Sequence, residues 1–204
     1  MADIKVLVET PRLRVLLPPA SFAPRYLAYV ERNREHLEPW EPPRPAAYYN
    51  EAFWRARILA DREDFAADRA VRLAIQRRDQ RDGEVIGFCN FNHVIRGAFH
   101  AATLGYSLDG AAVGQGLMFE ALSAALAYVF GELRLHRVQA NYIPTNERSG
   151  RLLRRLGFVV EGYARDYLFI GGAWRDHVLT ALTSPNPGPP EMPGVSDPLL
   201  QPGR

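Results

Sequence analysis

The chain has 204 residues, which is enough for one domain with a sizeable hydrophobic core. Its 25 lysines and arginines against 23 acidic residues leave a formal net charge of +2 at pH 7, which excludes a nucleic-acid binder that depends on bulk positive charge. Hydrophobic residues make up 47% of the chain, which excludes wholesale disorder.

The first part of the chain combines one strand-like stretch with two helical stretches. Alternating apolar and basic residues predict a strand over 12–17, which two prolines end. Ser21 is placed to cap a helix that runs to about residue 34. A stiff proline loop over 38–48 separates it from a second helix, predicted for 51–67.

The middle of the chain begins with a hairpin. Strand patterns over 71–77 and 84–94 flank Asp79-Gln-Arg-Asp-Gly, a sequence typical of a turn. A further strand is predicted for 102–108. A small-residue loop follows it, and helical spacing of apolar residues predicts a helix over 117–130.

The last part alternates strand, helix and hairpin. We expect a strand over 136–143, a helix over 146–156 that Gly157 ends, and strands over 158–170 and 174–182. The strand and helix order predicts a mixed α/β fold with several antiparallel pairs. Residues 185–204 contain seven prolines, which predict an irregular C-terminal tail. We therefore expect one domain over 1–184 followed by this tail.

Several protein classes are excluded at this point. The single cysteine, Cys89, forms neither an intramolecular disulfide nor a site of several cysteine ligands. The five histidines show no ligand spacing, so we expect no metal. We see no secretory signal and no apolar run long enough for a membrane span, and therefore expect a cytoplasmic protein without membrane contact.

Two stretches are placed to carry chemistry. The loop over 110–116 contains glycines directly before a helix, so its backbone N–H groups and the helix N-terminus could cradle a phosphate. A plain strand-to-helix turn explains the same pattern, and both interpretations stay open. Asn146 is placed as a helix N-cap, and Ser149 lies on the inward stripe of that helix. A buried serine either bonds to a backbone carbonyl or donates a proton.

Six stretches carry a family resemblance. They are Leu37-Glu-Pro-Trp40-Glu-Pro, Asn90-Phe-Asn, Arg96-Gly-Ala-Phe-His, Leu104-Gly-Tyr-Ser, Gly116-Leu-Met-Phe-Glu-Ala-Leu and Asp166-Tyr with Trp174-Arg-Asp-His-Val-Leu-Thr-Ala-Leu. With Gly114-Gln-Gly116, Asn146-x-x-Ser149 and Leu156-Gly-Phe158, they resemble the GCN5-related N-acetyltransferase (GNAT) superfamily. The similarity covers roughly residues 9–185 and is closest to its Rim branch of ribosomal-protein-alanine N-acetyltransferases, of the RimJ type.

The resemblance implies a GNAT-like fold and acetyl-CoA as cofactor. The fold is a mixed, largely antiparallel sheet flanked by helices, with two central parallel strands, here about 102–108 and 136–143, that splay apart around the cofactor. The loop's backbone would bind the pyrophosphate, although Ala111 stands where relatives often have Gln or Arg. The implied cofactor-binding residues are Tyr106, Ser107, Leu108, Ala111, Ala112, Val113, Gly114, Gln115, Gly116, Leu117, Asn141, Asn146 and Ser149.

The resemblance also implies catalytic residues. Relatives that use a tyrosine as general acid carry it where Leu153 stands here, whereas the Rim branch has a serine at the position of Ser149. Ser149 would therefore protonate the departing CoA thiolate, unless the thiolate simply leaves and water protonates it. An α-amine has a pKa of about 7.7–8.0, so a carboxylate acting through water suffices as base. The candidates are Glu120, Asp166 and His93.

The expected acceptor is the N-terminal α-amine of a protein, an Ala-starting ribosomal protein, attacked directly in a ternary complex. The residues expected to line its groove are Trp40, Asn92, His93 and Tyr167. Two alternatives stay open: an acetyltransferase for a small-molecule amine, and a non-catalytic acyl-CoA-binding or ribosome-associated module. We expect no direct contact with nucleic acid, and a monomer or homodimer.

Overall fold

The structure is a computed structural model and describes residues 4–80, 83–186 and 188. This part of the chain forms an eight-stranded sheet in the order β1-β2-β3-β4-β5-β6-β8-β7. The strands are β1 (Lys5–Glu9), β2 (Leu13–Leu17), β3 (Val71–Arg77), β4 (Val85–Ile95), β5 (Ala101–Leu108), β6 (Arg137–Gln139), β7 (Val159–Ile170) and β8 (Ala173–Thr183). The α-helices are α1 (Ala23–Arg32), α2 (Arg34–Leu37), α3 (Glu51–Ala66), α4 (Leu117–Gly131) and α5 (Glu147–Arg155).

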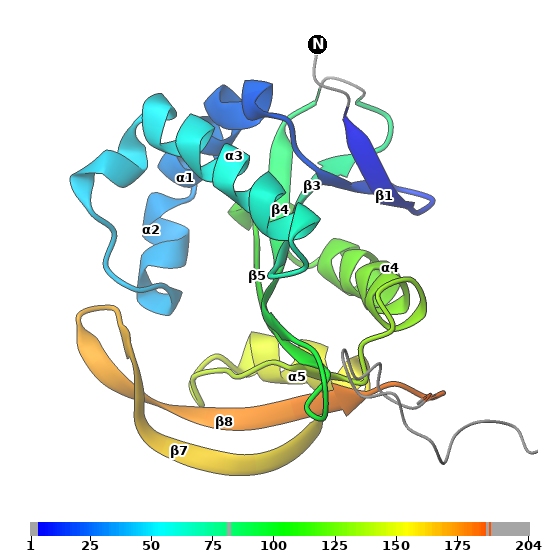
Figure 1. Ribbon diagram of the computed structural model, residues 1–204. Coiled ribbons are helices and arrows are strands. Elements are labelled where there is room, and N and C mark those ends of the chain that lie inside the picture. The colour runs from blue at the N-terminus through cyan, green and yellow to red at the C-terminus, as the bar shows by residue number, and fades with distance from the viewer. Residues whose placement is uncertain (1–3, 81–82, 187, 189–204) are drawn as a thin grey trace, which may run out of the picture.

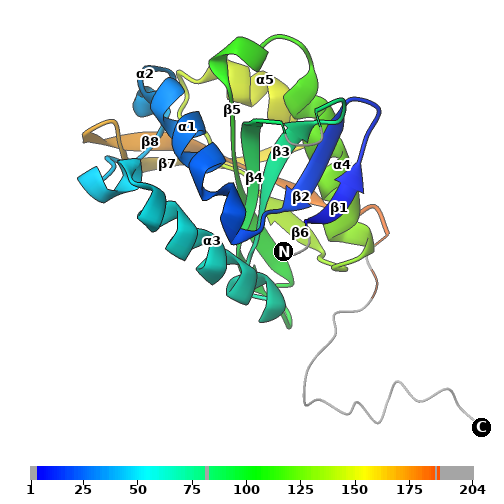
Figure 2. The ribbon, with the colours of Figure 1, turned by 90° about the horizontal axis from the view of Figure 1, so that it is seen from above.

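Helices cover both faces of the sheet, and each face has its own apolar cluster. Helices α1 and α3 lie on one side of β2–β4 and α4 lies on the other, as Figure 2 shows. On the α1 and α3 face, Phe22, Tyr29 and Ile58 pack against Phe88 of β4. On the α4 face, the helix packs against the alternate side chains of the same strands, among them Phe91. The period-two alternation of β4 thus serves both clusters.

The central strands part after a short parallel pairing. β5 and β6 pair in parallel over Ala101, Ala102 and Thr103 of β5, and the other neighbouring strands in this sheet are antiparallel. β5 then continues to Leu108, while the chain after β6 leaves β5 and stays beside β8, where Tyr142 pairs with Val178. The edge of β5 that faces β6 is therefore open over 104–108, which is the splay that the family resemblance implied.

The last two strands form a long, curved hairpin that reaches under the molecule in Figure 1. Its turn, Gly171-Gly172, has positive φ angles of 57° and 80°, the left-handed backbone that a two-residue hairpin turn needs. The Gly171 N–H donates to the Glu41 carbonyl oxygen at 3.1 Å. The hairpin thus meets the proline-rich segment after α2 and closes that side of the molecule.

Most sequence-predicted elements are confirmed, with four differences. β1 was not predicted, because it is a mostly exposed edge strand with a weak alternation. Ser21 lies in a 3-10 turn (Ala20–Phe22) and caps nothing, because α1 begins at Ala23 with a proline in its first turn. β6 is shorter than 136–143, and the proline loop contains two 3-10 turns, Glu38–Trp40 and Ala46–Tyr49.

Two predicted regions lie partly or mostly outside the residues that the structure describes. Most of the predicted tail, residues 187 and 189–204, lies outside the described residues, as do residues 81–82 of the first hairpin turn. Within the described ranges, every helix is too short or too polar to cross a lipid bilayer.

Candidate active site

The loop between β5 and α4 presents a row of backbone N–H groups. Gly114 and Gly116 have φ angles of 82° and 73°, and Gly116 is the N-cap of α4 without a side-chain cap. Among the described residues, none accepts a hydrogen bond from the N–H groups of residues 114–119. A Cβ added to Gly114 would have no heavy atom within 4 Å. Free N–H groups, open space and the positive end of α4 together form an anion cradle.

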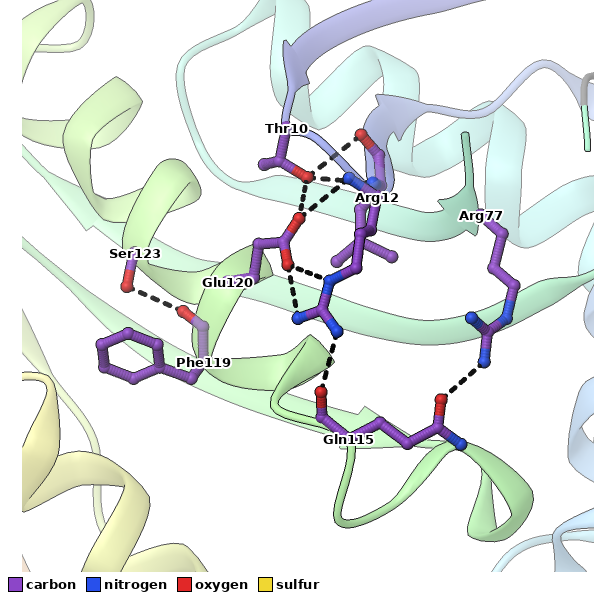
Figure 3. A network of polar contacts seen from close by, with 8 residues as sticks. Thr10, Arg12, Arg77, Gln115, Phe119, Glu120 and Ser123 are labelled. Carbon is purple, nitrogen blue, oxygen red and sulfur yellow. Dashed lines mark hydrogen bonds and ion pairs between the residues drawn. The ribbon is translucent and has the colours of Figure 1, made fainter. Parts of the chain in front are cut away.

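Two arginines hold this loop from the first strands (Figure 3). The Arg12 guanidinium donates to the Glu120 carboxylate with Nε–Oε2 at 2.6 Å and to the Gln115 carbonyl oxygen at 3.0 Å. Arg77 donates to the Gln115 side-chain oxygen at 2.9 Å. Gln115 in turn donates to the Ala111 carbonyl oxygen at 3.0 Å. The loop shape therefore depends on contacts from Arg12 and Arg77, which lie 103 and 38 positions before Gln115 in the chain.

Glu120 belongs to this loop anchor. Its carboxylate accepts hydrogen bonds from the Thr10 hydroxyl at 2.6 Å and from the Arg12 N–H at 3.0 Å, besides the guanidinium. Burial alone would raise the pKa of Glu120, but these hydrogen bonds and the Arg12 charge lower it. The prediction of Glu120 as general base is therefore corrected: its oxygens are engaged in holding the loop.

The other end of the loop is fixed by α1. Asp109 accepts from Arg32 Nε at 2.5 Å and from Asn33 Nδ2 at 3.2 Å, and Asn33 Oδ1 accepts from the Gly110 N–H at 2.9 Å. Burial would raise the pKa of Asp109, but the hydrogen bond from Arg32 and those from the Ala111 N–H and Asn33 lower it. The sequence carries no signal for these long-range hydrogen bonds, because each joins residues far apart in the chain.

The splay is bridged by two hydroxyl groups. Tyr106 of β5 and Ser149 of α5 share a hydrogen bond with their oxygens 2.6 Å apart. The Ser149 N–H donates to the Asn146 side-chain oxygen at 3.1 Å, which confirms Asn146 as the N-cap. A Cβ added to Gly150 would lie 2.8 Å from the ring of Tyr142, so the helix sits close against the chain after β6. The fold thus brings together Tyr106, Asn146 and Ser149, three of the residues that the family resemblance implied for cofactor binding.

The Tyr106 hydroxyl is a proton donor at neutral pH. Burial raises the pKa of Tyr106 to about 12, although the hydrogen bond to Ser149 acts in the opposite direction. The Cys89 thiol is not placed to act as a nucleophile, because it is fully buried and burial raises its pKa to about 12. The interpretation of Cys89 as a core residue is confirmed.

A cavity of about 410 Å³ lies on the α1 and α3 face of β4 and β5, and we name it the central cavity. Its aromatic wall consists of Tyr26, Trp40, Tyr48, Phe53, Trp54 and Phe88. Its polar lining consists of Glu41, Arg44, Arg57, Asp61, Arg72, Asn90 and Asn92. Gly105, Tyr106 and Ser107 of β5 complete it, so the cavity reaches the strand from which Tyr106 contacts Ser149. Trp40 and Asn92, expected to line the acceptor groove, lie here.

The carboxylates of the central cavity are paired. Glu41 accepts from Arg44 at 2.9 Å, and Asp61 forms ion pairs with Arg57 and Arg72 at 2.9 Å each. Burial raises the pKa of Asp61, although the two arginines act against that rise. Sequence reasoning missed this cluster, although the i,i+4 spacing of Arg57 and Asp61 could have indicated their ion pair.

Three residues predicted for the site lie elsewhere. His93 is exposed on a β4 bulge with φ 52°, and Asp166 is exposed on a β7 bulge with φ 47°. The Tyr167 hydroxyl accepts from the Asn141 side chain at 3.2 Å, and the Asn141 oxygen accepts from the Thr180 N–H at 3.3 Å. None of them lines the central cavity. The contacts of Asn141 join the chain after β6 to the hairpin.

Comparisons with known proteins agree with this geometry. An acetyltransferase (GNAT) domain model matches residues 13–159. The [ribosomal protein uS5]-alanine N-acetyltransferase of Escherichia coli strain K12 is 47% identical over 182 residues, covering 89% of this chain and 93% of the relative. The ribosomal-protein-S5-alanine acetyltransferase of Vibrio fischeri superposes with a TM-score of 0.85 at 37% identity, covering 89% of this chain and 98% of that one.

A solved complex points to the cofactor. Mycobacterium smegmatis RimJ, in complex with CoA-disulfide, superposes with a TM-score of 0.79 at 28% identity and covers 89% of this chain and 85% of that one. The anion cradle before α4 and the open edge of β5 fit the pyrophosphate and the amide-containing arm of CoA. With its splayed sheet, its cradle and these relatives, this chain belongs to the GNAT acetyltransferase family.

Proposed function

We propose that this protein transfers the acetyl group of acetyl-CoA to the N-terminal α-amine of a protein, with an alanine-starting ribosomal protein as acceptor. The observation that carries this proposal is the 47% identity, over 89% of the chain, to an enzyme named for acetylating the alanine of ribosomal protein uS5. A ribosomal-protein acceptor and acetyl-CoA as cofactor support a cytoplasmic location as part of this proposal.

The chain offers a place for each part of acetyl-CoA. The cradle formed by the N–H groups of residues 114–119 would hold the pyrophosphate, and the open edge of β5 at Tyr106, Ser107 and Leu108 would pair with the pantetheine arm. Arg155 of α5 lies 4.0 Å from the centre of the Phe119 ring, which brings a guanidinium beside the first turn of α4. Bound acetyl-CoA would supply the activated acetyl group.

Side chains beside the splayed strands would take part in the proton transfers of the reaction. Attack by the neutral amine forms the C–N bond and breaks the C–S bond; the nitrogen loses one proton and the sulfur gains one. Ser149 Oγ holds a proton beside the open edge of β5, and Tyr106 supports it through the 2.6 Å contact. Water in the central cavity would take the amine proton, because an α-amine with a pKa of about 7.7–8.0 needs no strong base.

The cavities favour a peptide acceptor over a small amine. A second cavity of about 640 Å³ shares Glu41, Arg44 and Tyr48 with the central cavity and reaches the hairpin turn at Gly171 and Gly172. An extended acceptor would therefore find lining residues well beyond the reacting amine. A lysine side chain, with a pKa of about 10.4, is almost wholly protonated at pH 7 and reacts less readily than an α-amine.

The test is acetyl transfer to peptides that differ only in their first residue, read by mass spectrometry. We expect acetylation of the peptide with a free N-terminal alanine and none when that amine is blocked. Transfer to polyamines or amino-acid derivatives, with all peptides silent, would replace the proposal with the small-amine function. Acetyl-CoA binding by calorimetry without any transfer would indicate a non-catalytic module.

A further inference from the structure

Asn90 lies on the floor of the central cavity, in a row of three residues across the sheet. Its cross-strand partners are Arg72 on β3 and Gly105 on β5, and all three line the cavity. A Cβ added to Gly105 would have no heavy atom within 4 Å. The Asn90 side chain is half-buried and therefore borders open space at the strand that carries Tyr106.

The polar neighbours of Asn90 are engaged with one another. Arg72 donates to Asn92 Oδ1 at 2.7 Å, to Asp61 Oδ1 at 2.9 Å and to Asp64 Oδ2 at 2.7 Å. In contrast, the Asn90 carboxamide has no hydrogen-bond partner within the described part of the chain. A half-buried carboxamide without an internal partner is available to a ligand, with one acceptor oxygen and two N–H donors.

The charges of the cavity favour a neutral amine. Both carboxylates in its lining, Glu41 and Asp61, are paired with arginines, and three guanidinium groups face the same space. An ammonium ion would find no unpaired carboxylate there, and the nearby positive charges lower the pKa of an amine. The neutral amine is the nucleophilic form, so the cavity favours the reactive species.

We propose that the Asn90 carboxamide oxygen accepts a hydrogen bond from the acceptor α-amine and holds it beside Gly105 for attack; this assignment rests on the proposed function. A neutral carboxamide suits this task, because it binds an N–H without stabilising the ammonium form. A carboxylate at the same position would raise the pKa of the amine and protect it from reaction. Asn90 is thus the acceptor-binding residue, while Asn92, which the sequence favoured, is held by Arg72.

The test compares Asn90→Ala and Asn90→Asp with the wild-type enzyme, using an alanine-starting peptide. We expect Asn90→Ala to lower kcat/KM about three- to tenfold, the loss of one hydrogen bond. We expect Asn90→Asp to move the acidic limb of the kcat/KM pH profile upward by about one unit. Binding of the peptide to the enzyme–CoA complex, measured by calorimetry, should weaken in Asn90→Ala while CoA binding is unchanged. Asn186→Asp makes the same charge change at an exposed position after β8. It should leave the kcat/KM pH profile and the peptide affinity unchanged.

Each other outcome has a separate meaning. Wild-type pH profiles and peptide affinity in both Asn90 variants would overturn the assignment of Asn90 while leaving the proposed function intact. A loss of peptide affinity in Asn92→Ala but not in Asn90→Ala would overturn it in favour of Asn92. A wild-type enzyme that acetylates no peptide would contradict the proposed function itself. If Asn90→Ala does not fold, Asn90→Ser keeps a small polar side chain and takes its place in the same comparison.

Discussion

The hydroxyl oxygens of Tyr106 and Ser149 lie 2.6 Å apart, one on the part of strand β5 that β6 leaves unpaired and the other in the first turn of α5. Tyr106 packs against the apolar cluster on the α4 face, while its strand also lines the central cavity. A serine hydroxyl alone is a weak acid. A buried phenol at hydrogen-bond distance stabilises negative charge as the serine proton moves.

Ser149→Ala should lower kcat about a hundredfold, the lower end of the range for a general acid, with little change in the affinity for acetyl-CoA. Steady-state kinetics across pH with an alanine-starting peptide measure this effect. Ser123→Ala is the matched control, because the Ser123 hydroxyl only donates to the Phe119 carbonyl oxygen within α4. Unchanged turnover of Ser149→Ala at every pH would show that Ser149 has a structural role and that water protonates the thiolate.

Tyr106→Phe should reduce kcat by a smaller factor, about three- to tenfold, because it removes one hydrogen bond and keeps the ring. It should also change alkaline stability. The folded pKa of Tyr106 is raised by burial to about 12, above the unfolded value of about 10. Its contribution to stability is therefore fully present below pH 10 and is lost as the pH rises toward 12.

Denaturant unfolding between pH 9 and pH 12 checks this prediction, and Tyr106→Phe should lose less stability over that range than the wild type. An equal loss in both proteins would contradict the placement of a protonated phenol at this position. Tyr163→Phe serves as the comparison, because the pKa of this exposed tyrosine is raised chiefly by its hydrogen bond to Asp176 and not by burial.

Gly114→Ala should weaken acetyl-CoA binding about tenfold or more. Its φ angle of 82° is costly for alanine, by about 1–2 kcal/mol, and a shift of this backbone would disturb the cradle. Gly172→Ala is a close control, because Gly172 has a φ angle of 80°, also has no neighbour within 4 Å and lies in the β7–β8 turn. Both variants should lose similar stability in thermal unfolding, but only Gly114→Ala should raise the Kd of acetyl-CoA. An equal Kd in both would argue against the cradle.

Glu120→Gln should destabilise the protein by about 1–2 kcal/mol, a value that already allows for the exposure of Arg12. It should also raise the Kd of acetyl-CoA, because the loop loses the ion pair that holds it. Since the pKa of Glu120 is lowered, its contribution is present above the unfolded pKa of about 4.3 and is lost as the pH falls through the folded pKa. Denaturant unfolding at pH 7 and pH 3 measures this.

Glu147→Gln is the control for this change, because the Glu147–Arg151 pair is an exposed i,i+4 pair. It should alter stability by no more than about 0.5 kcal/mol. A general base at Glu120 would instead show as a lost acidic limb in the pH profile of kcat, with acetyl-CoA affinity and stability unchanged.

Local sequence patterns predicted most of the fold. A turn sequence between two strand-like stretches identified the β3–β4 hairpin, and helical spacing of apolar residues identified α4, because that helix buries a regular stripe. The pattern missed β1 and overestimated β6. Strand β1 has little buried surface to impose alternation, and beyond Gln139 the chain leaves β5 to meet β8, a choice that alternation does not encode.

The sequence alone determined the residues whose role depends on near neighbours. Asn146 caps the helix that carries Ser149, and the glycines at 114 and 116 open the loop before α4, because such contacts span only a few residues. Only the tertiary structure decided the contacts of Glu120, Tyr106 and Asn90. Arg12, directly before β2, donates to Glu120, Tyr106 contacts Ser149 beside the splay, and Arg72 donates to Asn92 and not to Asn90. Such contacts join chain segments that only the folded sheet brings together.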